Sequence, residues 1–276
     1  MNSPDERGDI PPGTILSLRR VTKTRPGKVP YRLMIASLSV ERGSRIALAG
    51  QSGSGKSTLL DMLALVSAPD PPEKGSEFVW APGSTKERLD VSQDWKSGSG
   101  KRREAVRRRD LGYILQSGGL LPFLSVRDNI LVPARLKKHP EGKDLEERLE
   151  HISSRLGIQR LLKKLPSRIS VGERQRAAAA RALIHSPSLL LADEPTASLD
   201  PPTAAKVFEL FLELAGESGA AVVLATHNRD QAERFGFAVH TVECEDREGR
   251  IVSWLSPPAG DPEDSGKLIV VKTADD

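Results

Sequence analysis

The sequence predicts an α/β fold whose core is a mainly parallel sheet, and three observations support that prediction. Apolar segments at residues 45–49, 188–195 and 221–226 have the character of buried strands. A glycine-rich loop follows the first strand, and an apolar segment with helical spacing follows the loop at residues 59–65. Acidic residues end the second strand and a histidine follows the third. Because parallel strands bring their carboxyl ends to one edge, we expect these groups to converge there.

The glycine-rich loop matches the phosphate-binding pattern G-x-x-x-x-G-K-[ST] at every fixed position. It consists of Gly50, Gln51, Ser52, Gly53, Ser54, Gly55, Lys56, Ser57 and Thr58. Its glycines let successive N–H groups point inward, and the helix that follows adds the donors of its N-terminus. Lys56 is expected to reach the β- and γ-phosphates, and Ser57 to ligate Mg²⁺. The alternative, a glycine-rich turn that matches by chance, is opposed by the flanking strand and helix.

The polar residues at the strand ends indicate a hydrolytic site. Asp193 is placed to hold the Mg²⁺ shell, and Glu194 to polarise a water in line with the γ-phosphate. His227 follows the third strand at the same edge. A histidine in that position is by itself more often structural, so its role depends on the surrounding motifs.

Three further segments give the chain a resemblance to the ATP-binding cassette (ABC) ATPases. Residues 169–176, I-S-V-G-E-R-Q-R, are similar to the family signature L-S-G-G-Q, and an alanine-rich helix follows. Residues 197–200, A-S-L-D, are similar to the D-loop. Gln116 stands where the family has its Q-loop glutamine, and His227 falls on the switch histidine. The resemblance covers roughly residues 14–255, with Ser170 as the expected cap of the signature helix.

The resemblance implies an α/β P-loop NTPase cassette that binds ATP and Mg²⁺ and hydrolyses ATP. It implies a cassette domain over residues 14–255 with an antiparallel β region near the N-terminus, a helical subdomain at approximately 117–180, and tails at 1–13 and 256–276. The implied catalytic residues are Glu194, His227 and Gln116, and the implied metal ligands are Ser57, Gln116 and Asp193. Beyond the loop itself, the implied nucleotide contacts are Arg25, Ser170, Gly172 and Asp200.

Three positions depart from the family pattern, and the mildest departure is Glu173 in place of the signature glutamine. Val171 stands at the first signature glycine, and a β-branched residue neither adopts positive φ easily nor lets a phosphate come as close to the backbone. Arg25 stands where the family has an aromatic residue that stacks on adenine, with Tyr31 several residues away. Since the guanidinium group is planar, Arg25 can still stack on a base.

The family's ATP sites lie between two cassettes, and this chain contains one. The resemblance therefore implies a second cassette, with a homodimer expected and a heterodimer as the alternative, and a separate integral membrane permease subunit driven by ATP-dependent dimerisation. Residues 118–130 are similar to the stretch L-L-P-x-L-T-x-x-E-N-V of the bacterial lipoprotein-release and macrolide-efflux cassettes. Residues 120–124 can also simply pack the helical subdomain.

Composition indicates where such a protein works. No apolar run approaches the ~20 residues of a membrane span, and residues 1–7 lack the apolar core of a signal peptide. We therefore expect a cytoplasmic protein, peripheral on the cytoplasmic face of the inner membrane. The one cysteine, Cys244, excludes an intrachain disulfide and is expected to fill space in a late strand.

A dense basic run occupies residues 101–109, although the formal net charge is only +4. It is either a solvated helix face or a contact for anionic lipid or acidic loops of a membrane partner. The segment before it, residues 80–100, is rich in Gly, Ser, Asp and Lys and is expected to be variable surface chain.

Two rival functions are a non-transport ABC ATPase acting on DNA or ribosomes, and an inactive ATP-sensing scaffold. Lys56 and Ser170 are too close in the sequence to enclose a long coiled coil, and neither tandem cassettes nor zinc-binding cysteines occur. No nucleic-acid partner is therefore expected. The joint presence of Lys56, Asp193, Glu194 and His227 argues against the scaffold, although Val171 keeps it open.

Overall fold

The computed structural model describes residues 11–81, 88–137, 143–196, 201–247 and 249–258, with only the backbone described at 201–203. The strands are β1 Thr14–Arg25, β2 Tyr31–Glu41, β3 Arg45–Ala49, β4 Glu77–Trp80, β5 Leu89–Asp90, β6 Leu111–Ile114, β7 Leu189–Asp193, β8 Ala221–Thr226, β9 Ala238–Arg247 and β10 Arg250–Ser256. The helices are α1 Lys56–Leu63, α2 Val91–Ser97, α3 Lys101–Asp110, α4 Val126–Leu136, α5 Lys143–Arg155, α6 Val171–Leu183, α7 Pro201–Glu217 and α8 Arg229–Arg234, with 3-10 turns η1 Gln159–Leu161 and η2 Pro166–Arg168.

These strands form one 10-stranded sheet that has a parallel half and an antiparallel half. In the parallel half, β9, β3, β8, β7 and β6 lie side by side in that order, each parallel to its neighbour. In the antiparallel half the order is β5-β4-β1-β2. β10 joins the halves, antiparallel to β9 and parallel to β2. The predicted mainly parallel core with an antiparallel region near the N-terminus is confirmed.

The central strands are buried on both faces. Along β7, Leu190 and Ala192 pack into the cluster formed with α4, α5, α6 and α7, whereas Leu189 and Leu191 pack into the cluster formed with α1, β1 and β2. Successive side chains of a strand point to opposite faces, so a strand covered on both sides must be apolar throughout. That requirement explains the uninterrupted apolar run in the sequence.

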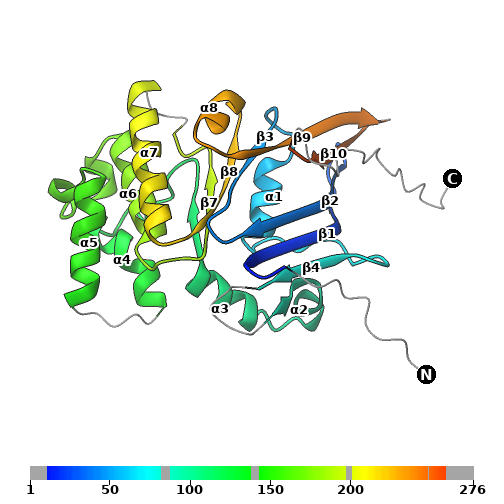
Figure 1. Cartoon of the computed structure of the whole chain (residues 1–276), viewed down its shortest axis with the longest axis horizontal. Coiled ribbons are helices and arrows are strands. Elements are labelled where there is room, and N and C mark those ends of the chain that lie inside the picture. The colour runs from blue at the N-terminus through cyan, green and yellow to red at the C-terminus, as the bar shows by residue number, and fades with distance from the viewer. Residues whose placement is uncertain (1–10, 82–87, 138–142, 197–200, 248, 259–276) are drawn as a thin grey trace.

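The sequence predicts helices at 144–156 and 159–165, between Gln116 and the signature, and the observed helices differ from these in part. They gather beside the β7 side of the sheet (Figure 1). α5 begins and ends one residue before the predicted 144–156. The helix predicted at 159–165 is wrong, because only η1, of three residues, forms there. Leu165 has φ −82° and ψ 154°, since the ring of the following proline excludes the helical region for the residue before it.

Residues 89–97, predicted as variable surface chain, instead form β5 and α2. Trp80 ends β4 with 0% exposure, and Asp94 of α2 is buried. An oxygen of Asp94 lies 2.6 Å from a guanidinium nitrogen of Arg103, and the Arg103 guanidinium lies 3.6 Å from the centroid of the Trp95 ring. The expectation of variable surface chain is wrong for these residues, because a buried ion pair joins α2 to α3.

The basic run on α3 is therefore partly structural. Arg103 is buried in the pair with Asp94, and Arg107 donates a 2.7 Å hydrogen bond to the Leu65 carbonyl just beyond α1. Lys101, Arg102 and Arg108 stay exposed on the same helix. Neither interpretation of the whole run, a solvated face or a lipid contact, holds for its buried members.

Two further observations concern the surface. Cys244 lies on β9 but is exposed, so the prediction that it fills space in the core is wrong. Within the described ranges, no helix combines the length and the apolar character needed to cross a bilayer.

Candidate active site

The glycine-rich loop connects β3 to α1 and leaves the first N–H groups of α1 without a side-chain cap. Gly55 is the N-cap residue of α1, with φ 105°, and no side chain accepts a hydrogen bond there. Lys56 places its ammonium group inside the loop, where it donates to the carbonyl oxygens of Gly50 at 2.7 Å and Gln51 at 2.8 Å. Free N–H groups around a cation are the arrangement that binds a polyphosphate.

The loop leaves no room for larger residues at two of its glycines. A Cβ on Gly50 would lie 2.4 Å from the Val242 carbonyl oxygen of β9. A Cβ on Gly55 would lie 1.6 Å from the Tyr31 hydroxyl oxygen. Both glycines are therefore required for packing, and Gly55 also for its left-handed φ.

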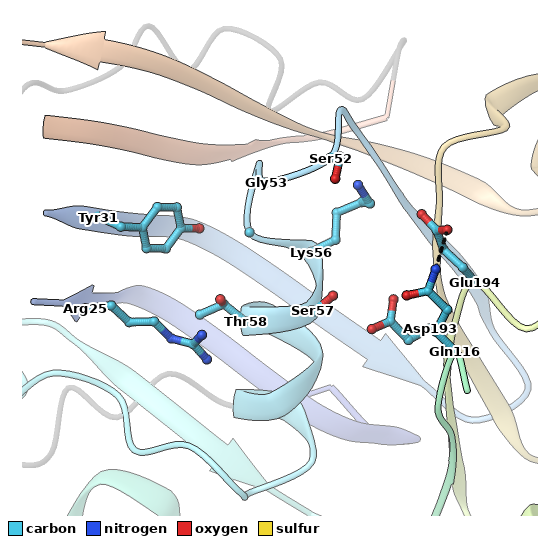
Figure 2. Close-up of a pocket in the computed structure, with 11 residues that line it drawn as sticks. Arg25, Tyr31, Ser52, Gly53, Lys56, Ser57, Thr58, Gln116, Asp193 and Glu194 are labelled. Carbon is cyan, nitrogen blue, oxygen red and sulfur yellow. Dashed lines mark hydrogen bonds between the residues drawn. The ribbon is translucent and has the colours of Figure 1, made fainter. Parts of the chain in front are cut away.

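The carboxyl end of β7 supplies the acidic side of the site. Glu194 follows β7 with φ 45°, a left-handed conformation that costs on the order of 1 kcal/mol for a residue other than glycine. Its carboxylate oxygens lie 3.4 Å from Gln116 Nε2 and 3.3 Å from His227 Nδ1. Figure 2 shows Gln116, Asp193 and Glu194 together on the side of the pocket opposite Tyr31 and Arg25.

Asp193 faces the first turn of α1. Burial raises the pKa of Asp193, while a hydrogen bond from Ser57 and the charge of Lys56 act in the opposite direction. Burial likewise lowers the pKa of Lys56, and the carboxylates of Glu194 and Asp193 act against it. A hydroxyl oxygen beside a carboxylate is a donor set that suits Mg²⁺, which takes oxygen ligands and keeps several waters. In the described part of the chain, no group of three or more His, Cys, Asp or Glu side chains offers a competing metal site.

A pocket of about 390 Å³ contains these groups. Its lining comprises Arg25, Tyr31, Ser52, Gly53, Gly55, Lys56, Ser57, Thr58, Gln116, Asp193 and Glu194. The sequence predicts ten of these eleven as site residues, and the structure adds Tyr31. His227 is not part of the lining but contacts Glu194 at its edge.

Tyr31 lies directly opposite Arg25 because the two residues pair across the β1–β2 hairpin. Its hydroxyl donates to the Ser54 carbonyl at 3.2 Å, and burial raises its pKa. Arg25 lies 3.5 Å from an Asp61 carboxylate oxygen. Tyr31 is six residues from Arg25 in the sequence, at a position that does not match the adenine-stacking residue of the family. The residues Pro26 and Gly27 favour a turn between two strands, and this signal could have predicted that Arg25 and Tyr31 lie side by side.

The signature residues lie outside this pocket, at the start of α6. The Ser170 side chain accepts from the Glu173 N–H, and the Glu173 side chain accepts from the Ser170 N–H, which confirms Ser170 as the cap. Val171 is the first residue of α6, is 45% exposed, and is absent from the described residues with positive φ. The expected left-handed strain at Val171 is therefore wrong, since a helical φ suits valine. Gly172 follows Val171 in the same helical turn, and Asp200 lies outside the described residues.

A strand, a glycine loop around a lysine, and a carboxylate pair at the end of β7, which β8 separates from β3, define a P-loop nucleoside triphosphatase. The family model described as ABC transporter matches residues 33–197. The chain belongs to the ABC transporter family, as one of its ATP-binding, ATP-hydrolysing cassettes.

Individual relatives agree with the family. The chain is 39% identical over 218 residues to the lipoprotein-releasing system ATP-binding protein LolD of Maricaulis maris, covering 79% of this chain and 88% of that protein. It is 37% identical over 217 residues to the ABC transporter ATP-binding protein YxdL of Bacillus subtilis, covering 78% of each. The dimeric structure of a post-hydrolysis state of the ATP-binding cassette MJ0796 bound to ADP and Pi matches with a TM-score of 0.69 and 28% identity, covering 82% of this chain and 93% of that chain.

Proposed function

We propose that this cassette hydrolyses MgATP in a site completed by a second copy of the chain, and that the closure of the two copies drives a membrane subunit. Lys56 and the N–H groups of the loop bind the phosphates. Ser57, Asp193 and Gln116 hold Mg²⁺, which neutralises charge on the phosphates when bound. Glu194 polarises the attacking water, and His227 orients the Glu194 carboxylate.

The observation that carries this proposal is the position of Glu194. Its carboxylate is within 3.4 Å of both Gln116 and His227, at the edge of a pocket whose other lining residues include Lys56 and Ser57. A carboxylate that polar side chains contact on two sides is held in one orientation, which suits it to accept a proton from water. The strained φ of Glu194 also favours a functional role over a structural one.

The nucleotide base is proposed to lie between Tyr31 and Arg25, which line the pocket from neighbouring strands. The phenol ring offers an apolar face, and the guanidinium offers a planar cation. Ser170, Gly172 and Asp200 are proposed to contact ATP held by the other copy, because the first two lie outside this chain's own pocket.

Metal dependence tests the proposed chemistry. We expect the purified chain to release phosphate from ATP in the presence of Mg²⁺ and to stop when EDTA removes the metal, while ATP stays bound. Equal turnover with and without EDTA would refute the role of Ser57 and Asp193.

The membrane subunit is proposed to dock on the loop that follows Gln116. Phe123 is 74% exposed there and Leu121 38%, and Leu115, just before Gln116, is 41% exposed. An amphipathic cytoplasmic helix of the membrane subunit would bury these side chains, on the cytoplasmic face of the membrane. Similarity to LolD, the ATP-binding protein of a lipoprotein-releasing system, and to YxdL, an ABC transporter ATP-binding protein, supports a transporter subunit as the partner.

Phe123→Asp tests this docking surface. The variant should detach from membranes of cells that contain the native partner and lose partner-stimulated turnover, because a buried carboxylate without a counter-ion opposes docking. ATP binding by the isolated chain should change little. Phe123→Leu is the matched control and should stay bound. A Phe123→Asp variant that remained membrane-bound and fully stimulated would place the interface elsewhere, with the exposed cations of α3 as the next surface to examine.

A further inference from the structure

Gln116 lies in a tight turn after β6. The Gly118 N–H donates to the Leu115 carbonyl at 2.8 Å and closes this turn. Gly118 and Gly119 have φ values of +76° and +57°, so the chain reverses here through two left-handed residues. Since glycines restrict the backbone little, the turn needs external contacts to hold Gln116 in one place.

Arg181 of α6 supplies those contacts. Its Nη2 donates to the Gly118 carbonyl at 2.9 Å, and its Nη1 donates to the Gly119 carbonyl at 2.7 Å. Burial lowers the pKa of Arg181, and among the described residues no carboxylate acts against that effect. A half-buried cation without an acidic partner is costly, so its two neutral acceptors must be well placed. The planar fork of arginine suits such a pair of parallel acceptors.

The strand before the turn also rests on α6. A Cβ on Gly112 of β6 would lie 2.4 Å from the Ala182 carbonyl oxygen, so the two backbones are in direct contact. A Cβ on Gly118 would lie 3.6 Å from the Arg174 carbonyl oxygen of the same helix. β6, the Gln116 turn and α6 thus form one packed unit.

That unit has two functional ends. Gln116 at one end is 3.4 Å from Glu194. Ser170 caps the other end of α6, and at ~1.5 Å per residue it lies about 16 Å along the helix from Arg181. A rotation of α6 would therefore move the signature and the Gln116 turn together, provided that Arg181 keeps its hydrogen bonds to the Gly118 and Gly119 carbonyls.

We propose that Arg181 is a positioning residue that fixes the Gln116 turn to the signature helix, so that the glutamine reaches the acidic side of the site only when α6 has the matching orientation. The inference rests on the proposed function of Gln116 and adds a residue that acts through it. Arg181 touches neither nucleotide pocket nor metal ligand directly. Its effect is on the geometry of Gln116.

The chain offers a matched control in Arg148 of α5. Its Nε donates to the Ile184 carbonyl and its Nη2 to the Leu183 carbonyl, both at 2.9 Å. Burial lowers the pKa of Arg148 as it does for Arg181. Arg148→Met therefore removes the same kind of double contact from the same helix without touching the Gln116 turn.

The experiment compares Arg181→Met, Arg181→Lys and Arg148→Met in the full chain. Arg181→Met should lower turnover at saturating MgATP by about tenfold or more, because small displacements of a positioning group cost this much. Its affinity for ATP in EDTA should stay within about twofold of the original, since Lys56 and the loop are intact. Arg181→Lys, which keeps the charge and one contact, should recover part of the loss. Arg148→Met should keep its turnover at temperatures where it is folded.

Amide hydrogen exchange without nucleotide provides a readout that does not depend on activity. Arg181→Met should speed exchange at residues 116–121 by about tenfold, and Arg148→Met should not. Equal losses of turnover in the two methionine variants, or unchanged exchange at 116–121 in Arg181→Met, would overturn the proposal. A parent protein that hydrolyses no ATP would refute the proposed function instead, and the exchange comparison would still decide whether Arg181 holds the turn.

Discussion

Asn129 holds the loop that carries Phe123, so its replacement by leucine should lower the free energy of unfolding. Asn129 is 0% exposed in the first turn of α4. Its Oδ1 accepts from the Leu121 N–H at 2.7 Å. Its Nδ2 donates to the carbonyls of Leu121 at 3.0 Å, Leu124 at 3.1 Å and Ser125 at 3.0 Å.

Leucine has the same number of side-chain heavy atoms and the same branching, so Asn129→Leu leaves no cavity, removes these hydrogen bonds and introduces two bulkier methyl groups at a fully buried position. The Ser125 carbonyl keeps the bond from the Asn129 backbone N–H at 2.9 Å. The Leu121 carbonyl likewise keeps the bond from the Leu124 N–H at 3.3 Å. The Leu121 N–H and the Leu124 carbonyl lose this partner. A net hydrogen bond contributes about 1 kcal/mol, and a buried group left unpaired costs somewhat more. The expected loss in the free energy of unfolding is about 3 kcal/mol.

Urea denaturation measures this loss, with Lys143→Ala as the control in the same lobe. Lys143 forms an exposed pair with Glu147 at 3.5 Å, which should contribute less than about 0.5 kcal/mol. Asn129→Asp separates the two sides of the amide, because aspartate still accepts from Leu121 but cannot donate when ionised. A loss below about 1 kcal/mol for Asn129→Leu, or an Asn129→Asp variant as stable as the original, would refute the reasoning.

Two further predictions concern the signature and pH. Val171→Gly should raise turnover or the fraction of ATP-bound dimer, because removal of the exposed side chain at the start of α6 lets a phosphate approach. This gain should outweigh the cost of up to ~1 kcal/mol for glycine in a helix. Unchanged or lower values of both turnover and dimer fraction would show that the valine is accommodated. His185 is 2% exposed, and burial lowers its pKa from 6.5 to about 4. The unfolded chain therefore binds the proton more readily, so stability should fall as the pH drops from 6.5 towards 4, by up to about 3 kcal/mol. His185→Gln should flatten that slope in pH-dependent denaturation, and an unchanged slope would show that other groups cause it.

The parallel core and the phosphate-binding loop could be predicted from the sequence because their signals are local. Strand β8 has the bounds expected from its apolar run, and β3 likewise. A strand buried on both faces must be apolar, and a backbone that surrounds phosphate must be glycine-rich. Both requirements act on residues that are adjacent in the chain, so a single sequence shows them as an apolar run and as a glycine-rich loop.

Other features depend on contacts between distant segments, which a single sequence does not display. Arg103 looks like one more surface cation until Asp94 and Trp95 are seen beside it. Tyr31 joins the pocket through its register with Arg25 across a hairpin. The helix predicted at 159–165 is a different case, because Pro166 in the sequence already restricts the backbone of Leu165.

The most direct test of the account is the behaviour of Glu194→Gln with MgATP. Glutamine keeps the shape and the neighbours of Glu194 but cannot accept the proton of the attacking water. We predict that this variant binds ATP, hydrolyses it at least about a hundredfold more slowly, and elutes as an ATP-bound dimer in size-exclusion chromatography. Lys56→Ala should bind no ATP and stay monomeric under the same conditions. Turnover of Glu194→Gln equal to that of the original, with no gain of dimer, would contradict the assignment of Glu194 as the water-polarising group.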